Sequence, residues 1–282
     1  MEISLYFRQA YLQTNENICQ DMRINFIMDI KKTPLGHKND QLSFAVEHAS
    51  NIGMIRTNNE DNYIVAPYYG LYLVVDGLGG HEDGEIASAI AATSVVKSIK
   101  GGKTLSEAFA AAHHEILSAS TLGVGTRGMG ATVVALYIDK SDYQVSWVGD
   151  CRAYLWNGSL KQLTKDHTLV QMLIDQGKIT ALEAESHPDR NILMHSLGSP
   201  IKKNIYVETV TGKIRPEDSF LLCSDGLSNE LSDRDIEKIM LIDTDISEKL
   251  DQLLSLALDR GGRDNITLIL MKQNNGSDRN RH

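Results

Sequence analysis

The sequence has little cysteine, no long apolar run and no excess of positive charge. Its three cysteines, Cys19, Cys151 and Cys223, are far apart and form no CxxC pair. A zinc site or a disulfide framework is therefore not expected, and a reducing compartment is the default setting. Cys151 and Cys223 lie in or beside apolar runs, which is typical of buried thiols rather than of nucleophiles.

The absence of a long apolar run argues against a membrane protein. No stretch approaches the roughly 18 consecutive apolar residues that a membrane span needs. The N-terminal stretch "MEISLYFRQAYLQTNENICQDMR" lacks a basic start followed by an apolar block, so it does not predict a signal peptide. We expect a cytoplasmic protein with no membrane partner.

The charge balance argues against nucleic acid as a partner. The 282 residues include 28 Lys and Arg against 37 Asp and Glu, a net charge of -9, whereas phosphate neutralisation needs clustered basic side chains. Surplus carboxylates suit a protein that holds cations, although mild acidity for solubility alone is the simpler alternative. The chain is long enough for a well-buried core.

Seven short apolar runs have the length and the β-branched or aromatic content of strands. They lie at residues 63–67, 70–77, 131–138, 143–150, 152–158, 218–226 and 265–272. Asn157 and Gly158 separate two apolar runs and predict a hairpin.

Apolar periodicity predicts helices between these strands. A broad stripe covers 85–99, and a capping box at Thr104 and Glu107 opens a second helix; shorter helices are expected at 169–176, 233–240 and 246–257. The order of elements predicts an α+β fold with antiparallel sheets, and a helix layer over each of two stacked sheets would bury every stripe.

Five aspartates stand at the ends of the predicted strands. They are Asp61, Asp76, Asp150, Asp225 and Asp264, and four of them have a glycine close by. Strand ends on one edge can converge, and gathered carboxylates repel one another unless cations share the site. Oxygen ligands without cysteine select Mg²⁺ or Mn²⁺ over zinc. A simple turn is the better interpretation of any one of these positions, but five separate turns are the less economical explanation.

The stretch "VDGLGGHEDGE" at residues 75–85 is either a phosphate cradle or part of a cation site. A nucleotide-binding loop would need GxGxxG opening a helix, or a GxxxxGK[ST] loop. The acidic residues that follow the glycines here would repel a pyrophosphate. Glu82, Asp83 and Glu85 are instead predicted to solvate the loop and to begin the helix.

Arg56 stands five residues before Asp61. Beside a metal cluster, its guanidinium would offer a bidentate fork to a phosphate. Without the cluster, a surface salt bridge would be the favoured interpretation.

Six motifs follow one another along the chain in the order found in a known protein family. "RTNNEDNY", "VVDGLGGHEDGEIAS", "GMGATVVAL", "VGDCRAYLWNG", "LLCSDGLSNEL" and "GGRDNITLI" resemble those of the metal-dependent protein phosphatases (PPM, the type 2C serine/threonine phosphatases), in the bacterial branch. The resemblance runs from about Phe44 to Met271. It implies a four-layer α-β-β-α sandwich, and hydrolysis of phosphoserine and phosphothreonine monoesters by a water that bridges two Mn²⁺ or Mg²⁺ ions.

The resemblance also implies roles for individual residues. Asp76 would bridge both ions, and the Gly77 carbonyl would help hold one of them. Asp225 and Asp264 would bind the other ion, and Asp61 would contribute through ordered water. Asp150 would help hold a third, weaker ion, and Arg56 would bind the phosphate. Asn265 is predicted to hold its loop by side-chain hydrogen bonds. Animal members carry a histidine as general acid where this chain has Leu78; His81 is either a substitute proton donor or a loop histidine, and the second interpretation is preferred.

Residues 1–40 have weak periodicity and end in a Lys/Pro/Gly/Asn cluster, which predicts an extension or linker with no assigned role. It is a docking segment, a flexible tail or the result of a mistaken start codon, with Met22 and Met28 downstream. The phosphatase domain is expected at 41–272 and a polar tail at 273–282. Residues 165–199 match the family's variable flap and are predicted to select substrates and to move. The flap histidines, His167, His187 and His195, have no particular metal spacing.

The implied partners are phosphorylated proteins marked by a bacterial serine/threonine kinase, and a monomer is expected. A catalytically weak or inactive relative that only binds phosphoproteins is the alternative. The loss of a metal-holding aspartate would be its signature, and all five aspartates are present.

Overall fold

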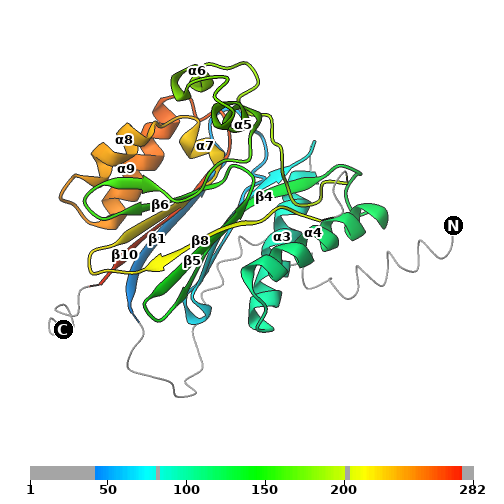
Figure 1. Cartoon of the computed structure of the whole chain (residues 1–282), viewed down its shortest axis with the longest axis horizontal. Helices are drawn as coiled ribbons and strands as arrows, with labels where there is room; N and C mark the ends of the chain where they lie inside the picture. Colours follow the sequence, from blue (N-terminus) through cyan, green and yellow to red (C-terminus); the bar gives the residue numbers. More distant parts are fainter. Residues whose placement is uncertain (1–41, 81–82, 201–203, 275–282) are drawn as a thin grey trace.

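Two antiparallel sheets of five strands each form the centre of the molecule (Figure 1). The computed structural model describes residues 42–80, 83–200 and 204–274. The strands are β1 (Phe44–Asn51), β2 (Asn62–Ala66), β3 (Leu71–Leu78), β4 (Gly130–Asp139), β5 (Asp142–Val148), β6 (Arg152–Trp156), β7 (Leu160–Gln162), β8 (Glu208–Lys213), β9 (Ser219–Cys223) and β10 (Ile266–Gln273). One sheet has the order β1-β10-β9-β6-β7 and the other β2-β3-β4-β5-β8.

Helices cover the outer face of each sheet (Figure 1). The helices of the described residues are α3 (Asp83–Lys100), α4 (Leu105–Thr121), α5 (Leu169–Asp175), α6 (Ala181–Glu185), α7 (Asp225–Ser228), α8 (Asp233–Met240) and α9 (Ile246–Asp259), with a 3-10 turn η1 at Pro67–Tyr69. The pair α3 and α4 flanks the β2–β8 sheet, and the pair α8 and α9 flanks the other. The predicted four-layer α-β-β-α sandwich is confirmed.

The core has three layers because successive residues of a strand face opposite sides of a sheet. In β3, Leu73 packs toward α3 and α4, while Val74 packs between the two sheets. In β9, Leu222 joins the layer between the sheets, and Leu221 packs under α8 and α9. Apolar burial on both faces of these central strands holds the four layers together.

Most elements lie where the sequence predicts them. The seven predicted strands and five predicted helices are present, with small shifts at their ends, and the capping box at Thr104 and Glu107 begins α4. The predicted hairpin joins β6 to β7. Sequence reasoning missed β1 and β8, which are edge strands with polar residues on their half-buried or exposed positions.

The ends of the chain are only partly described. The N-terminal extension, with Cys19, and residues 275–282 lie outside the described residues, whereas β10 continues to Gln273, one residue past the predicted end of the domain. Cys151 and Cys223 are buried, as predicted. Among the helices of the described ranges, none has the length and apolar character needed to cross a membrane.

Candidate active site

The five predicted aspartates gather at one edge of the sandwich because of strand register. Asp61 directly precedes β2, whose Asn62 pairs with Val75, so Asp61 lies beside Asp76 near the end of β3. Asp150 follows β5 at the same end of this sheet.

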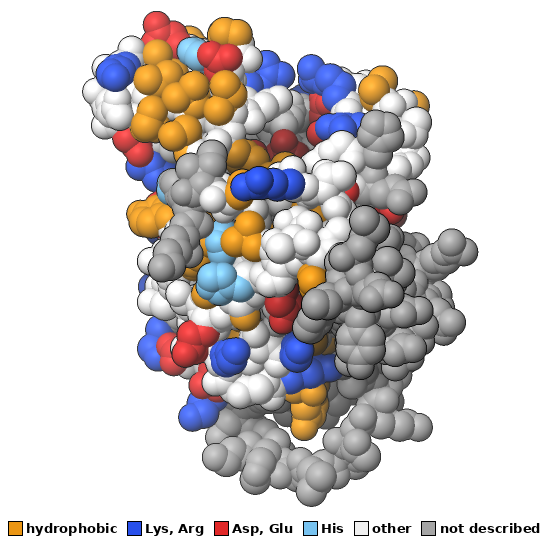
Figure 2. Space-filling model, turned by 90° about the vertical axis from the view of Figure 1, so that its right-hand side faces the viewer, with side chains coloured by type: hydrophobic (Ala, Val, Ile, Leu, Met, Phe, Trp, Pro, Cys, Tyr) orange, Lys and Arg blue, Asp and Glu red, His pale blue; other side chains and the backbone are white. Residues whose placement is uncertain are grey.

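The second sheet contributes the other two aspartates at the matching edge. Cys223 of β9 pairs with Leu268 of β10, so the end of β9 and the start of β10 are neighbours. Asp225 begins α7 just after β9, and Asp264 stands just before β10. Figure 2 shows acidic side chains recessed near the top of one face of the molecule.

The pKa values show that these carboxylates interact. Desolvation raises the pKa of Asp61 to about 7 and that of Asp225 to about 6. Desolvation is also the main reason that the pKa values of Asp76 and Asp150 lie well above the ordinary range. For Asp76 the next cause is repulsion from the other four aspartates, so all five act on one site. Without a cation, the ionised forms destabilise one another.

The donor set fits hard cations that keep part of their water. Asp150 Oδ1 is buried and finds no hydrogen-bond partner among the described residues, and the charged groups that act on Asp76 are the carboxylates of the other four aspartates. Within the described residues, no group of three His, Cys, Asp or Glu side chains has the spacing of direct metal ligands. The carboxylates are therefore close enough to interact electrostatically, but they do not form a complete set of direct metal ligands. Mg²⁺ in particular is usually held by one or two carboxylates and several waters.

Gly77 lets two segments of the site come into close contact. A Cβ atom there would lie 2.1 Å from the Gly84 carbonyl oxygen and 2.7 Å from that of Glu60. The Gly77 N–H also donates to the Glu60 carbonyl at 3.2 Å. Only glycine fits at this position, so the loop after β3 is held against the start of α3 and against the residue before Asp61.

Arg56 pairs with one of the predicted metal-binding aspartates. Its Nη2 donates to Asp264 Oδ2 at 2.7 Å, and 50% of the Arg56 side chain is exposed. This hydrogen bond is the main reason that the pKa of Arg56 is raised. Because an exposed ion pair contributes little stability, the guanidinium can leave Asp264 for another anion at a small free-energy cost.

Asn265, directly before β10, holds the loop between β1 and β2 at three points. Its Nδ2 donates to the carbonyl oxygens of Ile52 and Asn58, both at 2.9 Å, and its Oδ1 accepts from the Glu60 N–H at 2.7 Å. These bonds agree with a loop-holding role and leave no donor of the amide for a substrate.

Two polar residues that support the aspartates were not predicted. Ser224 Oγ donates to Asp61 Oδ2 at 2.7 Å and accepts from the Thr267 N–H at 3.0 Å. Asn229 Nδ2 donates to Asp225 Oδ2 at 2.9 Å. The Asn229 contact has a sequence signal, since the two residues are four apart on a helix. The Ser224 contact joins residues 163 positions apart and depends on sheet register.

The predicted general-acid candidate, His81, lies outside the described residues. Leu78 is the last residue of β3 and is half-buried. Its apolar side chain supplies no proton at the position where animal members carry histidine.

The flap is bonded to the loop that carries Asp150. His167 Nδ1 accepts from the Gly149 N–H at 3.1 Å, and the His167 ring lies 5.1 Å from that of His195. His187 is used locally, where its Nδ1 accepts from the Asp189 N–H at 3.1 Å. The three flap histidines therefore do not form one site.

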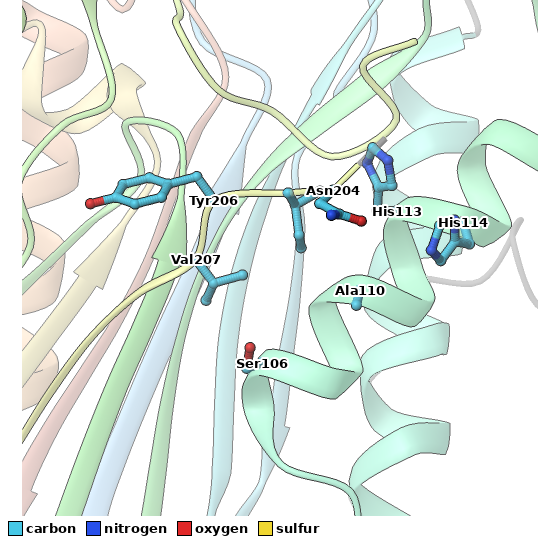
Figure 3. Close-up of a pocket in the computed structure, with 8 residues that line it drawn as sticks. Ser106, Ala110, His113, His114, Asn204, Tyr206 and Val207 are labelled. Carbon is cyan, nitrogen blue, oxygen red and sulfur yellow. The ribbon is translucent and has the colours of Figure 1, made fainter. Parts of the chain in front are cut away.

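A separate pocket of about 400 Å³ lies between α4 and the segment before β8 (Figure 3). It is lined by Ser106, Ala110, His113, His114, Asn204, Ile205, Tyr206 and Val207. His113 is buried, and its Nδ1 accepts from the Gly198 N–H at 3.1 Å. None of the predicted site residues lines this pocket, so it is distinct from the acidic edge.

The chemistry of a carboxylate-lined edge on a four-layer α-β-β-α sandwich suits hard cations such as Mg²⁺ and Mn²⁺. The model of the protein phosphatase 2C family matches residues 57–270. The chain is 34% identical over 242 residues to the serine/threonine phosphatase stp of Listeria welshimeri, covering 81% of this chain and 95% of that protein. The chain belongs to the protein phosphatase 2C family.

Solved structures agree with this assignment. The Mycobacterium tuberculosis serine/threonine phosphatase PstP/Ppp superposes with a TM-score of 0.76 at 32% identity, over 82% of this chain and 99% of that one. A structure of the PstP catalytic domain in complex with two manganese ions has a TM-score of 0.73 at 31% identity, with the same coverage. The predicted family, fold class and enzyme class are confirmed.

Proposed function

We propose that this protein is a metal-dependent serine/threonine protein phosphatase that hydrolyses phosphoserine and phosphothreonine monoesters in phosphorylated proteins. The observation that carries the proposal is the convergence of five aspartates on one edge of the sandwich, where Asp76 interacts with the other four. The named relatives are serine/threonine phosphatases, which supports the same activity here.

The cofactors are two Mn²⁺ or Mg²⁺ ions. Asp76 and the Gly77 carbonyl, with Asp225 and Asp264, would hold them, and Asp61 would contribute through water. Asp150 would hold a third, weaker ion. When bound, such ions lower the pKa of a water and neutralise charge on the phosphoryl oxygens. The manganese-containing structure of a relative supports this cofactor class.

The protein's own groups orient the substrate and the site. Arg56 would grip two phosphoryl oxygens and supply a fixed charge to them. Ser224 fixes the direction of the Asp61 carboxylate. Burial raises the pKa of the Cys151 thiol well above its ordinary value and that of Cys223 to about 12, so neither is a ready nucleophile. The lack of a reactive thiol agrees with direct attack by water, a route that needs no covalent intermediate.

The inactive phosphoprotein-binding alternative is less well supported. It would call for the loss or displacement of a metal-holding aspartate, yet all five lie at one edge and act on one another. The named phosphatase relatives also favour catalysis.

The biological setting belongs to the same proposal. We place the enzyme in the cytoplasm, as a monomer that removes phosphate from the targets of a bacterial serine/threonine kinase. The family relationship supports phosphoprotein substrates, and the particular kinase is an expectation by analogy.

The test is hydrolysis of p-nitrophenyl phosphate and of a phosphothreonine peptide in Mn²⁺. We expect Asp76→Ala and Asp225→Ala to lower kcat/KM by at least about a hundredfold, the scale of loss when one preorganised electrostatic group is removed. Asp251→Ala, at an exposed position of α9, is the matched control and should keep full activity. Unchanged turnover in either site variant would contradict the two-metal assignment.

A further inference from the structure

Residues 52–55 expose apolar side chains directly before Arg56. The exposed fractions are 67% for Met54 and 68% for Ile55, and Ile52 is 38% exposed. Single exposed apolar side chains are common and need no explanation. Here two large ones stand together, immediately before the residue that is proposed to bind phosphate.

The backbone of this segment is held firmly against the acidic site. The Met54 N–H donates to the Gly262 carbonyl at 2.7 Å, and the Gly53 N–H donates to Asn51 Oδ1 at 2.8 Å. The Ile52 carbonyl accepts from Asn265 Nδ2 at 2.9 Å. These three bonds fix the backbone, so the exposure of the two side chains is part of a defined conformation.

Gly53 makes this close attachment possible. It adopts a φ of +80°, and a Cβ atom there would lie 2.2 Å from the carbonyl oxygen of Asp264. The turn is therefore packed onto the residue that pairs with Arg56. Since consecutive Cα atoms are about 3.8 Å apart, Met54 and Ile55 lie within two residue lengths of the proposed phosphate-binding group.

We propose that Met54 and Ile55 form an apolar contact site for the substrate, which takes a hydrophobic side chain next to the phosphorylated serine or threonine. This inference rests on the proposed function. A peptide whose phosphate is held by Arg56 would place the residue next to its phosphoserine or phosphothreonine within reach of this adjoining segment. A leucine-sized side chain there would remove apolar surface of both partners from water.

A phosphoprotein segment fits this site better than a second copy of the chain. Two or three side chains cover far less than the roughly 1,000 Å² that a stable interface needs. The contact is instead continuous with Arg56 and the acidic edge, where a phosphorylated segment would already be held.

The experiment compares two phosphothreonine peptides that differ only beside the phosphothreonine, with leucine on both sides in one and serine in the other. In Mn²⁺, the wild type should hydrolyse the leucine peptide with a kcat/KM about tenfold higher, mainly through a lower KM. In the double variant Met54→Ser/Ile55→Ser we expect this preference to fall to less than about twofold, because the apolar contact is lost.

The matched control is Leu241→Ser/Ile242→Ser, another adjacent pair, exposed by 63% and 41% and following α8. It should keep the tenfold preference. A wild type that hydrolyses both peptides equally, or a Met54/Ile55 double variant that keeps the preference, would overturn the contact site and leave the phosphatase assignment standing. A wild type that hydrolyses neither peptide nor p-nitrophenyl phosphate would overturn the proposed function and the contact site with it.

Discussion

Replacing Asp61 by asparagine should stabilise the metal-free protein at alkaline pH while impairing catalysis. Desolvation raises the pKa of Asp61 from 3.8 to about 7, and repulsion from Asp225 and Asp264 adds to the shift. The folded state therefore binds the proton more tightly than the unfolded chain does. Stability is greatest below the unfolded pKa and is lost as pH rises from about 4 to about 7.

The size of the effect follows from the difference between the two pKa values. The shift from 3.8 to about 7 corresponds to about 4 kcal/mol as an upper bound, of which roughly 2–3 kcal/mol develops between pH 5 and pH 8. Neighbouring carboxylates share this penalty and water partly screens it, so we expect Asp61→Asn to recover about 1 kcal/mol of unfolding free energy. That gain is worth about 2–4 °C in Tm for a domain of this size.

The assay is thermal unfolding of both proteins in chelator at pH 5 and pH 8. The quantity to compare is the Tm difference between variant and wild type at each pH. Any change that the substitution causes in the hydrogen bond from Ser224 affects this difference equally at both pH values, so only the titration of Asp61 makes it vary with pH. We expect the Tm of the variant minus that of the wild type to be larger at pH 8 than at pH 5. Saturating Mn²⁺ should reverse the order, because a bound ion stabilises the form that holds it better. An Asp61→Asn variant that gains nothing between pH 5 and pH 8 would refute the reasoning.

Two further predictions concern Arg56 and Asn265. Arg56→Ala should raise KM for p-nitrophenyl phosphate by about tenfold or more, since hydrogen bonds to charged groups contribute about 1.5–3 kcal/mol. The KM of Arg56→Lys should lie between those of the wild type and Arg56→Ala, because lysine keeps the charge but cannot form two parallel hydrogen bonds. An unaltered KM in Arg56→Ala would count against the phosphate role. Asn265→Ala should lower the unfolding free energy by about 2–3 kcal/mol, because it removes three hydrogen bonds at about 1 kcal/mol each. Asn229→Ala removes one hydrogen bond and should lower the unfolding free energy by less than half as much in the same denaturant titration. Equal losses of unfolding free energy in the two variants would show that Asn265 does not hold its loop in place.

Local sequence signals were enough to predict the central strands and the long helices. The β3 and β10 runs are apolar on both faces, and Thr104 with Glu107 forms its capping box from residues three apart. The edge strands β1 and β8 carry polar residues and are only half-buried, so their pattern resembles that of a loop. Edge strands are specified by pairing with a neighbour, which a single segment does not reveal.

The site was predictable where residue type and strand ends coincide. An aspartate beside a glycine at the end of an apolar run marks Asp76 and Asp225. The partners of these aspartates were not predictable, because they come from distant parts of the chain. The Arg56–Asp264 pair spans 208 positions, and Ser224 reaches Asp61 only through the packing of the two sheets. Such contacts depend on register and layer packing rather than on local pattern.

A Mn²⁺ titration of chelator-stripped protein, with phosphate release from a phosphothreonine peptide as the signal, tests the central claim most directly. If the aspartate edge exists to hold catalytic cations, release should be absent without added ion and should rise to a plateau as Mn²⁺ is added. Equal phosphate release in chelator and in saturating Mn²⁺ would contradict the account.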